Sequence, residues 1–172
     1  MRLGGEAIKA AFAEHGPWVA WRNDQAIRET DLHIGSNSVD VTLDNQFITL
    51  YIPYERNYVN VLDSSTVRTK NLTSEALIIF PGDFILGCTR ERFQCSAKFE
   101  ERYWCQQLDG RSTIGRLGIG IHVTAGFGDY GFAGRFTLEM FNCGTVAVQL
   151  HAGMRIGQVS FEEVLKPILY KG

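Results

Sequence analysis

Hydrophobic and polar residues alternate along much of the chain, and this period of two predicts strands. Val39, Val41 and Leu43 alternate with polar residues, which is typical of a half-buried strand. Similar alternating or short apolar runs predict further strands at residues 47–52, 76–80, 84–88, 93–99, 118–124, 135–141, 145–150 and 155–161. Turns that contain Gly, Asp or Asn separate most of these runs at intervals of about 8–12 residues, which favours an all-β sandwich or barrel.

A helical period replaces the alternation near the N-terminus. Apolar residues recur at helical spacing within residues 5–14, so we expect a short amphipathic helix that ends at Gly16-Pro17. A second short helix or turn is expected over Asn23–Thr30, with Asn23 as its N-cap, and one helical turn within residues 111–117. The sequence contains no internal repeat, low-complexity tract or linker, which predicts a single domain over residues 1–172.

Composition and charge narrow the class of protein. Hydrophobic residues make up 45% and charged residues 21% of the chain, which is ordinary for a globular protein. The net charge of -2 leaves no basic surplus for binding nucleic acid. We find neither a transmembrane stretch nor the apolar core of a signal peptide, so we expect a cytoplasmic protein that does not bind membranes. The four cysteines fit no common zinc spacing and are expected to be reduced thiols.

The segment Gly110–Gly118 is the densest cluster of residues able to bind a phosphate. It contains two arginines, two hydroxyl side chains and three glycines. Glycine lets the backbone approach a ligand closely, backbone N–H groups at a turn or helix start bind phosphate oxygens, and arginine adds charge-assisted hydrogen bonds. The same pattern fits a polar loop that caps a short helix, and composition does not decide between the two.

A second cluster, Gly126–Gly134, combines glycines and aromatic residues around a single charge, Asp129. Such a hairpin can hold a planar base or a sugar, with Asp129 accepting a hydrogen bond from a hydroxyl group. The alternative, which the pattern favours, is a tight β-turn in which Asp129 bonds its own backbone.

Glu139 is a carboxylate within an apolar stretch that is expected to be a core strand. Burying a carboxylate is costly unless it is paired or functional, and burial raises the pKa of such a group toward the range useful for proton transfer. Strand alternation can instead point Glu139 to solvent, which is the more common outcome. His122 lies in a β-branched run and is more often a core histidine than a catalyst. The signatures of zinc nucleobase deaminases and P-loops are absent.

Together these segments resemble the dCTP deaminase family of the trimeric dUTPase-like superfamily. The resemblance covers most of the chain and is densest over residues 81–161. The matching segments are Pro81–Glu91 (PGDFILGCTRE), Gly110–Gly118 (GRSTIGRLG), Ile121–Ala125 (IHVTA), Leu138-Glu139, Phe141–Gly144 (FNCG) and Ala152–Phe161 (AGMRIGQVSF), with Asp129, Gly131 and Gly134 as single residues. The N-terminal MRL with its helix and the strand Ser38–Leu43 (SVDVTL) also match.

The resemblance implies a fold, an assembly and a reaction. The fold would be a distorted, jelly-roll-like β-barrel with a short N-terminal helix, assembled as a homotrimer with active sites shared between subunits. The reaction would be hydrolytic deamination of dCTP to dUTP and ammonia without zinc. Magnesium would arrive on the triphosphate of the deoxycytidine nucleotide.

The resemblance also implies roles for individual residues. Glu139 would take a proton from water and deliver it to N3 of cytosine as the water attacks C4, and Ser112 and Arg116 would order that water and the base. The implied substrate-binding residues are Arg111, Ser112 and Thr113 at the phosphates, Asp129 at the sugar 3′-hydroxyl, His122, Val123, Thr124 and Ala125 around the base, and Gln158 and Tyr170 elsewhere on the nucleotide.

Some positions depart from the family pattern. Residues 126–131 read GFGDYG where the family usually has HRIDPG, Thr113 replaces a second serine, and the sequence stops soon after Tyr170, before the usual tail is complete. Three alternatives therefore stay open: a dUTPase, a bifunctional dCTP deaminase and dUTP diphosphatase, and a nucleotide-binding regulatory trimer without turnover. No glycine-rich arm like that of dUTPases follows Phe161, and dUTPases lack a carboxylate at the position of Glu139, which both favour deamination.

Overall fold

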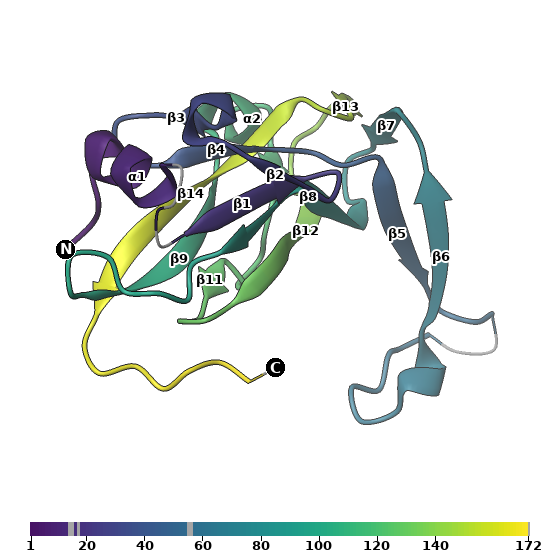
Figure 1. The fold of residues 1–172 in the computed structure, drawn as a ribbon. Coiled ribbons are helices and arrows are strands. Elements are labelled where there is room, and N and C mark those ends of the chain that lie inside the picture. The colour runs from purple at the N-terminus through teal and green to yellow at the C-terminus, as the bar shows by residue number, and fades with distance from the viewer. Residues whose placement is uncertain (14–15, 17, 55–56, 172) are drawn as a thin grey trace.

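The computed structural model describes residues 1–13, 16, 18–54 and 57–171. Residue 14 of the expected first helix and Pro17 of its stop signal lie outside the described residues. The described part consists mainly of β-strands arranged in sheets that curl around one another (Figure 1), so the predicted mostly-β fold class is confirmed.

The largest sheet has seven strands, and its order is β10-β12-β8-β1-β2, with β5 paired to β8 and β6 paired to β5. Every strand pair in it is antiparallel. The strands are β1 (Val19–Arg22), β2 (Gln25–Ile27), β5 (Gln46–Tyr51), β6 (Arg68–Thr73), β8 (Phe84–Gln94), β10 (Ile119–Gly120) and β12 (Ala133–Asn142).

A second sheet of five strands has the order β11-β9-β14-β4-β3, and β7 and β13 form a separate pair. Side chains from the two larger sheets meet in one core, where Phe93, Leu138, Leu108 and Phe161 are fully buried. The strands are β3 (His33–Ile34), β4 (Val39–Thr42), β7 (Ala76–Ile79), β9 (Tyr103–Gly110), β11 (Phe127–Gly128), β13 (Val148–His151) and β14 (Arg155–Val164).

The helices are short. Helix α1 (Gly5–Phe12) buries Ile8 and Phe12, and the Phe12 ring packs edge-on against Trp18, so the predicted amphipathic helix is confirmed. Helix α2 (Ser112–Gly115) confirms the predicted helical turn. Two 3₁₀ turns, η1 (Glu29–Asp31) and η2 (Ser64–Thr66), complete the list. None of the helices in the described ranges is long and apolar enough to cross a membrane.

Three predicted elements differ from the structure. Residues 23–30 contain the turn of the β1–β2 hairpin, then strand β2 and η1, in place of one helix or turn. Asn23 and Asp24 have φ values of 50° and 59°, which is the combination required by a two-residue type I′ turn. Within residues 93–99 only the first two belong to a strand, and within residues 118–124 only Ile119-Gly120 do.

Strand β14 joins distant parts of the chain. It pairs with β9 from Gly157 to Val164 and with β4 at its start. The N-terminal residues pair with the end of β14, on the edge that β4 occupies at its start. The N–H of Leu3 donates to the carbonyl of Phe161, and the N–H of Glu163 donates to the carbonyl of Met1. Figure 1 shows β14, in yellow, crossing the body of the molecule beside β9.

Strands β5 and β6 leave the body as an arm, defined here as residues 46–54 and 57–73. Only the middle of β5 is paired with β8, through Ile48 opposite Leu86 and Thr49 opposite Ile85. Beyond that point the two strands pair with each other alone, and Figure 1 shows them standing away from the two main sheets.

Candidate functional site

The segment 111–116 follows β9 and presents its polar side chains outward. Ile114 is buried and anchors the segment, while Ser112, Thr113 and Arg116 are exposed. The carbonyl of Arg111 accepts hydrogen bonds from the N–H groups of Ile114 and Gly115, which closes the helical turn. The hydroxyl and guanidinium groups are therefore displayed on a rigid turn and remain available to a ligand or partner.

Arg111 is held in place by Asp40 on β4. The Nη1 group of Arg111 lies 2.6 Å from Oδ2 of Asp40, and Nη1 of Arg155 lies 3.1 Å from the same oxygen. Asp40 and Arg111 are mostly buried, so the pair is screened less than a surface ion pair. Sequence reasoning missed Asp40, because 71 residues separate it from Arg111. The contact fixes the direction of the guanidinium group at the edge of the segment.

Gln158 reinforces the same edge from β14. Its Oε1 accepts a hydrogen bond from Oγ of Ser38, and its Nε2 donates to the carbonyl of Gly110 at 3.3 Å. Both ends of the amide are therefore engaged within the chain. This arrangement suits a residue that positions the backbone before Arg111, and the second amide hydrogen and the second lone pair of Gln158 still allow a contact with a ligand.

A cavity of about 440 Å³ opens beside the segment 111–116. It brings together four residues that the sequence singled out, and is lined by Gly110, Arg111, Ser112, Gly115, Ile119, Gly120, Ile121, His122 and Gln158. His122 is half-buried and does not belong to the core, and its Nδ1 has no hydrogen-bond partner among the described residues. The residue is thus on the cavity wall with an unsatisfied nitrogen.

Glu139 lies on the outer face of the seven-stranded sheet. Its neighbours Leu138 and Met140 are fully buried, whereas Glu139 is half-exposed, so alternation turns it away from the core. The N–H of Val123 donates to Oε2 of Glu139 at 2.8 Å. Of the two orientations that the sequence left open, the structure therefore shows the one in which strand alternation turns Glu139 out of the core.

Close packing of β10 on β12 places the 121–125 loop next to Glu139. Gly120 is paired with Phe141, and a Cβ atom on Gly120 would lie 2.2 Å from the Phe141 ring. Only glycine permits that approach. Thr124 and Ala125 are exposed in the loop that follows Val123. The backbone that the resemblance assigns to the base thus borders the proposed catalytic carboxylate.

The turn at residues 129–132 contacts the C-terminal segment. The N–H of Phe132 donates to the carbonyl of Asp129, and Gly131 has a φ of 91°, so the chain makes a tight turn here; among the described residues the Asp129 carboxylate makes no hydrogen bond to its own backbone. The Asp129 side chain is exposed. The N–H of Tyr170 donates to the carbonyl of Tyr130 at 2.9 Å, which brings Tyr170 beside the turn. Two predicted substrate-binding residues therefore lie together.

The two halves of the predicted catalytic set are not joined in one chain. No hydrogen bond or ion pair among the described residues links Glu139 to Ser112 or Arg116. The cavity that contains Ser112 is not lined by Glu139. Ser112 and Arg116 lie exposed on helix α2 and its C-cap, whereas Glu139 lies half-exposed on β12.

Within the part of the chain that the structure describes, the thiols and metal-ligating side chains form no second candidate site. All four cysteines are free, and burial raises the pKa of Cys95 well above its usual value. Burial also raises the pKa of Cys88 and Cys105, each of which is near a carboxylate. Across residues 1–13, 16, 18–54 and 57–171, no group of three or more His, Cys, Asp or Glu side chains could hold a metal ion.

Comparison with known proteins gives consistent matches. The model of the family described as "dCTP deaminase-like" matches residues 4–164. The "dCTP deaminase, dUMP-forming" of Halobacterium salinarum is 37% identical over 83% of this chain and 73% of its own. A protein of the same description from Bifidobacterium animalis subsp. lactis is 36% identical over 97% and 81%. The "dCTP deaminase" of Rhodospirillum rubrum is 35% identical over 78% and 71%.

A solved structure supports the fold. The crystal structure of 2′-deoxycytidine 5′-triphosphate deaminase from Agrobacterium tumefaciens superposes with a TM-score of 0.64. The alignment covers 93% of this chain and 47% of the other, at 18% sequence identity. The expected distorted barrel-like fold is therefore confirmed at the level of architecture.

Proposed function

Because the chain belongs to the dCTP deaminase-like family, we propose that it hydrolyses the 4-amino group of dCTP to give dUTP and ammonia. The observation that carries this proposal is the Glu139 carboxylate, oriented by the N–H of Val123 on an open sheet face beside the exposed loop 121–125. A carboxylate held in this way is suited to moving a proton between water and a base.

The reaction needs one water molecule and one group that accepts and returns a proton. Glu139 takes a proton from water as the water oxygen bonds to C4 of cytosine, and it delivers that proton to N3. Glu139 then carries the proton of the new C4 hydroxyl to the amino nitrogen, the C4–N bond breaks as the C4 carbonyl forms, and the products are a uracil nucleotide and NH₃. Arg116, which stays charged at neutral pH, and the hydroxyl of Ser112 orient the water and the base.

The remaining residues bind the nucleotide. Arg111, fixed by Asp40, and the hydroxyl groups of Ser112 and Thr113 take the phosphates. Asp129 accepts from the 3′-hydroxyl, and His122–Ala125 border the base. Tyr170 contributes from the C-terminal segment, and Gln158 acts by positioning Gly110. The magnesium ion that accompanies a triphosphate enters as part of the substrate, held by phosphate oxygens.

A site shared between copies of the chain would bring Glu139 and the segment 111–116 together, although they are not in contact within one copy. We place Glu139 and the loop 121–125 on one copy and the segment 111–116 on the next, in a homotrimer. Each copy would then contribute both halves, to different sites. A cytoplasmic location accords with four free thiols.

A second candidate is the bifunctional reaction that ends in dUMP. The relatives from Halobacterium salinarum and Bifidobacterium animalis subsp. lactis carry that description in their names, whereas that from Rhodospirillum rubrum does not. In this reaction a second water cleaves the α–β phosphate bond and releases pyrophosphate. The same phosphate-binding residues would serve both outcomes.

One experiment tests the proposal and separates the candidates. The protein is incubated with dCTP, dUTP, dCMP and CTP, and ammonia, uracil nucleotide and pyrophosphate are followed separately. Ammonia with dUTP supports deamination alone, and ammonia with dUMP and pyrophosphate supports the bifunctional reaction. Pyrophosphate from dUTP without ammonia from dCTP would indicate a dUTPase, and binding without turnover would indicate a regulatory protein.

A further inference from the structure

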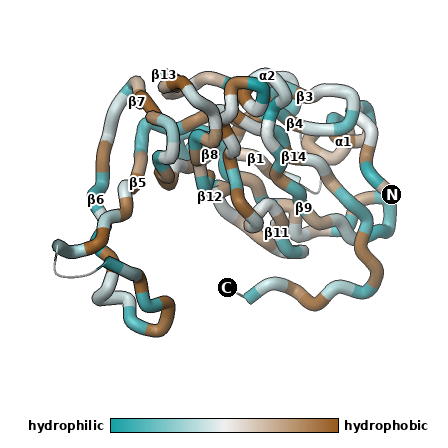
Figure 2. Tube along the Cα trace, turned by 180° about the vertical axis from the view of Figure 1, so that it is seen from behind, coloured by the Kyte–Doolittle hydropathy of each residue, from teal (hydrophilic) through white to brown (hydrophobic). Residues whose placement is uncertain are grey.

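The arm exposes apolar side chains that nothing in the described chain covers. Tyr54, Val61 and Leu62, near its far end, are almost fully exposed. Figure 2 shows hydrophobic stretches along the arm and in its distal loop. Exposed aromatic and aliphatic residues gathered on one projecting element are typical of an interaction surface.

The arm is ordered by its own contacts. Thr66 is completely buried at the far end, where its hydroxyl donates to the carbonyl of Asp63 at 2.7 Å and accepts from the N–H of Asn60. A two-stranded ribbon has little stability of its own in water, so the apolar face of such a ribbon gains stability when another surface covers it. The arm is therefore a preformed element suited to docking.

One face of the arm continues the sheet face that carries Glu139. Glu139 on β12 is paired with Leu86 on β8, and Leu86 is paired with Ile48 on β5. Neighbouring strands are about 4.8 Å apart, so Glu139 and Ile48 are separated by roughly 10 Å across the sheet. Alternation places Leu50 on the same face as Ile48 and turns Tyr51 to the opposite face.

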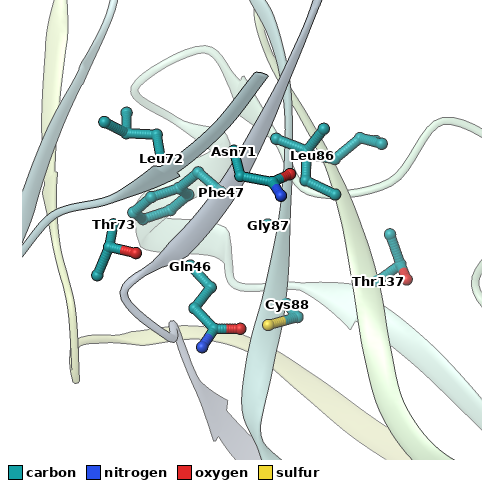
Figure 3. A pocket seen from close by; sticks show the side chains of 10 residues that line it. Gln46, Phe47, Asn71, Leu72, Thr73, Leu86, Gly87, Cys88 and Thr137 are labelled. Atoms are coloured by element: carbon teal, nitrogen blue, oxygen red, sulfur yellow. The ribbon is translucent and has the colours of Figure 1, made fainter. Parts of the chain in front are cut away.

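A cavity marks the junction between arm and body on this face. It has a volume of about 590 Å³ and is walled by side chains of β5 and β6 on one side and of β8 and β12 on the other (Figure 3). The cavity is lined by Thr137, which lies two residues before Glu139 on β12. It is also lined by Leu86, which is paired directly with Glu139 across β8 and β12. A molecule seated in this cavity would therefore lie next to Glu139.

We propose that the arm face of Ile48 and Leu50 docks on a second copy of this chain, namely the copy whose segment 111–116 completes the site at Glu139. The inference rests on the shared site of the proposed function. A partner that places Arg116 over Glu139 must occupy the same sheet face, within about 10 Å of Ile48. The arm therefore contacts the partner subunit at the edge of the active site.

Two neighbouring residues on opposite faces of β5 provide the test. Leu50 and Tyr51 have exposed fractions of 40% and 53%, so a carboxylate at either position is compatible with the isolated fold. Leu50→Asp buries an unpaired charge in the proposed interface, and we expect the dissociation constant of the assembly to rise ~100-fold or more. Tyr51→Asp is the matched control, and its dissociation constant should stay within about threefold of wild type.

The measurements are sedimentation and ammonia release over a protein dilution series, with circular dichroism to verify the fold. Loss of assembly and activity on dilution for Leu50→Asp alone, with recovery of both at high concentration, supports the proposal. An unaltered assembly in Leu50→Asp, equal weakening in both variants, or a wild type that is monomeric throughout would overturn it. If Leu50→Asp fails to fold, Leu50→Gln takes its place under the same criteria.

The sedimentation outcomes are independent of the reaction itself. If the wild type assembles but releases no ammonia from any cytosine nucleotide, the proposed function fails. The arm is then still judged by the sedimentation of Leu50→Asp and Tyr51→Asp.

Discussion

The N–H of Val123 and the Oε2 atom of Glu139 are joined by a hydrogen bond of 2.8 Å. The bond connects an exposed loop to a strand of the large sheet, so the direction of the carboxylate is set within one chain. The other oxygen, Oε1, has no hydrogen-bond partner in the described part of the chain and faces outward with the side chain. One oxygen thus positions the group while the second is available for water.

Glu139→Gln tests this division of roles. Glutamine keeps an oxygen that can accept from Val123, but its amide cannot take and return a proton at neutral pH. We expect ammonia release from dCTP to fall ~10²–10⁴-fold, the usual effect of losing a general acid–base group. The affinity for dCTP, measured by calorimetry, should be close to that of wild type because Glu139 is not assigned to the phosphates. Near-normal ammonia release would refute the proposed mechanism.

Mixing two inactive variants tests whether the site is shared. Arg116→Ala and Glu139→Gln should each be nearly inactive alone. If Glu139 and Arg116 come from different copies, random mixed assemblies contain about a quarter of their sites with both residues intact. Ammonia release should therefore recover to about that fraction after the variants are unfolded and refolded together. The absence of recovery in assemblies shown by mass spectrometry to be mixed would place both residues in one chain.

Asp40→Asn tests how far the orientation of Arg111 matters. The substitution removes the charge that holds Arg111 at 2.6 Å, so the guanidinium is no longer fixed in the direction proposed for phosphate binding. We expect the KM for dCTP to rise about tenfold, equivalent to ~1.4 kcal/mol of binding, with a smaller change in kcat. Asp31→Asn, in an exposed pair with Arg28, is the control and should leave both constants unchanged. A drop in kcat at unchanged KM would show that Asp40 acts elsewhere.

Glu91→Gln should destabilise the fold. Glu91 is completely buried and accepts hydrogen bonds from Arg22, the Thr42 hydroxyl and the Thr42 N–H, the last at 2.7 Å. Removing its charge leaves the Arg22 guanidinium partly buried and unpaired, which typically costs ~3–5 kcal/mol. Glu6→Gln breaks an exposed helix pair with Lys9 and should cost less than ~1 kcal/mol. Urea unfolding of both variants provides the comparison, and equal losses would contradict the assignment.

The buried thiol of Cys95 predicts a loss of stability in mildly alkaline solution. Burial raises the pKa of Cys95 well above its usual value, so the folded state keeps a proton that the unfolded chain releases above pH ~8.5. The free energy of unfolding should therefore be unaffected below that pH and decline above it, by up to ~1.4 kcal/mol per pH unit. Urea midpoints measured on both sides of that pH should fall less steeply in Cys95→Ala. An identical decline in wild type and variant would assign the effect to other groups.

The sequence predicted the strands that have one buried face. In β12 every second residue from Phe136 onward is buried, and in β4 the apolar residues Val39 and Val41 enter the core, which produces the period of two from which they were predicted. Strand β9 was missed because Trp104, Cys105 and Gln106 are buried in succession, which breaks the alternation. Strand β6 was missed for the opposite reason: five of its six residues are exposed, so no face is distinguished.

The candidate site was predictable residue by residue, and its geometry was not. Residue types marked the segment 111–116, Asp129 and Glu139, because each combines chemistry with an unusual neighbourhood. The outward orientation of Glu139 was one of two alternatives that the sequence pattern allowed, and the structure decides between them. The contact of Asp40 with Arg111 depends on strand order, a property of the three-dimensional arrangement that the sequence pattern does not contain.

Strand β14 has a consequence for the way the chain acquires its fold during synthesis. It lies between β9 and β4, so those two strands become one sheet only when residues 155–164 have left the ribosome. Until then β9 and β4 each expose a free edge, and edges of this kind pair readily with other chains. A topology so rich in distant pairings also folds slowly. Translation that stalls before residue 155 should therefore yield aggregation-prone fragments, and the nascent chain should depend on chaperones until its last strand is inserted.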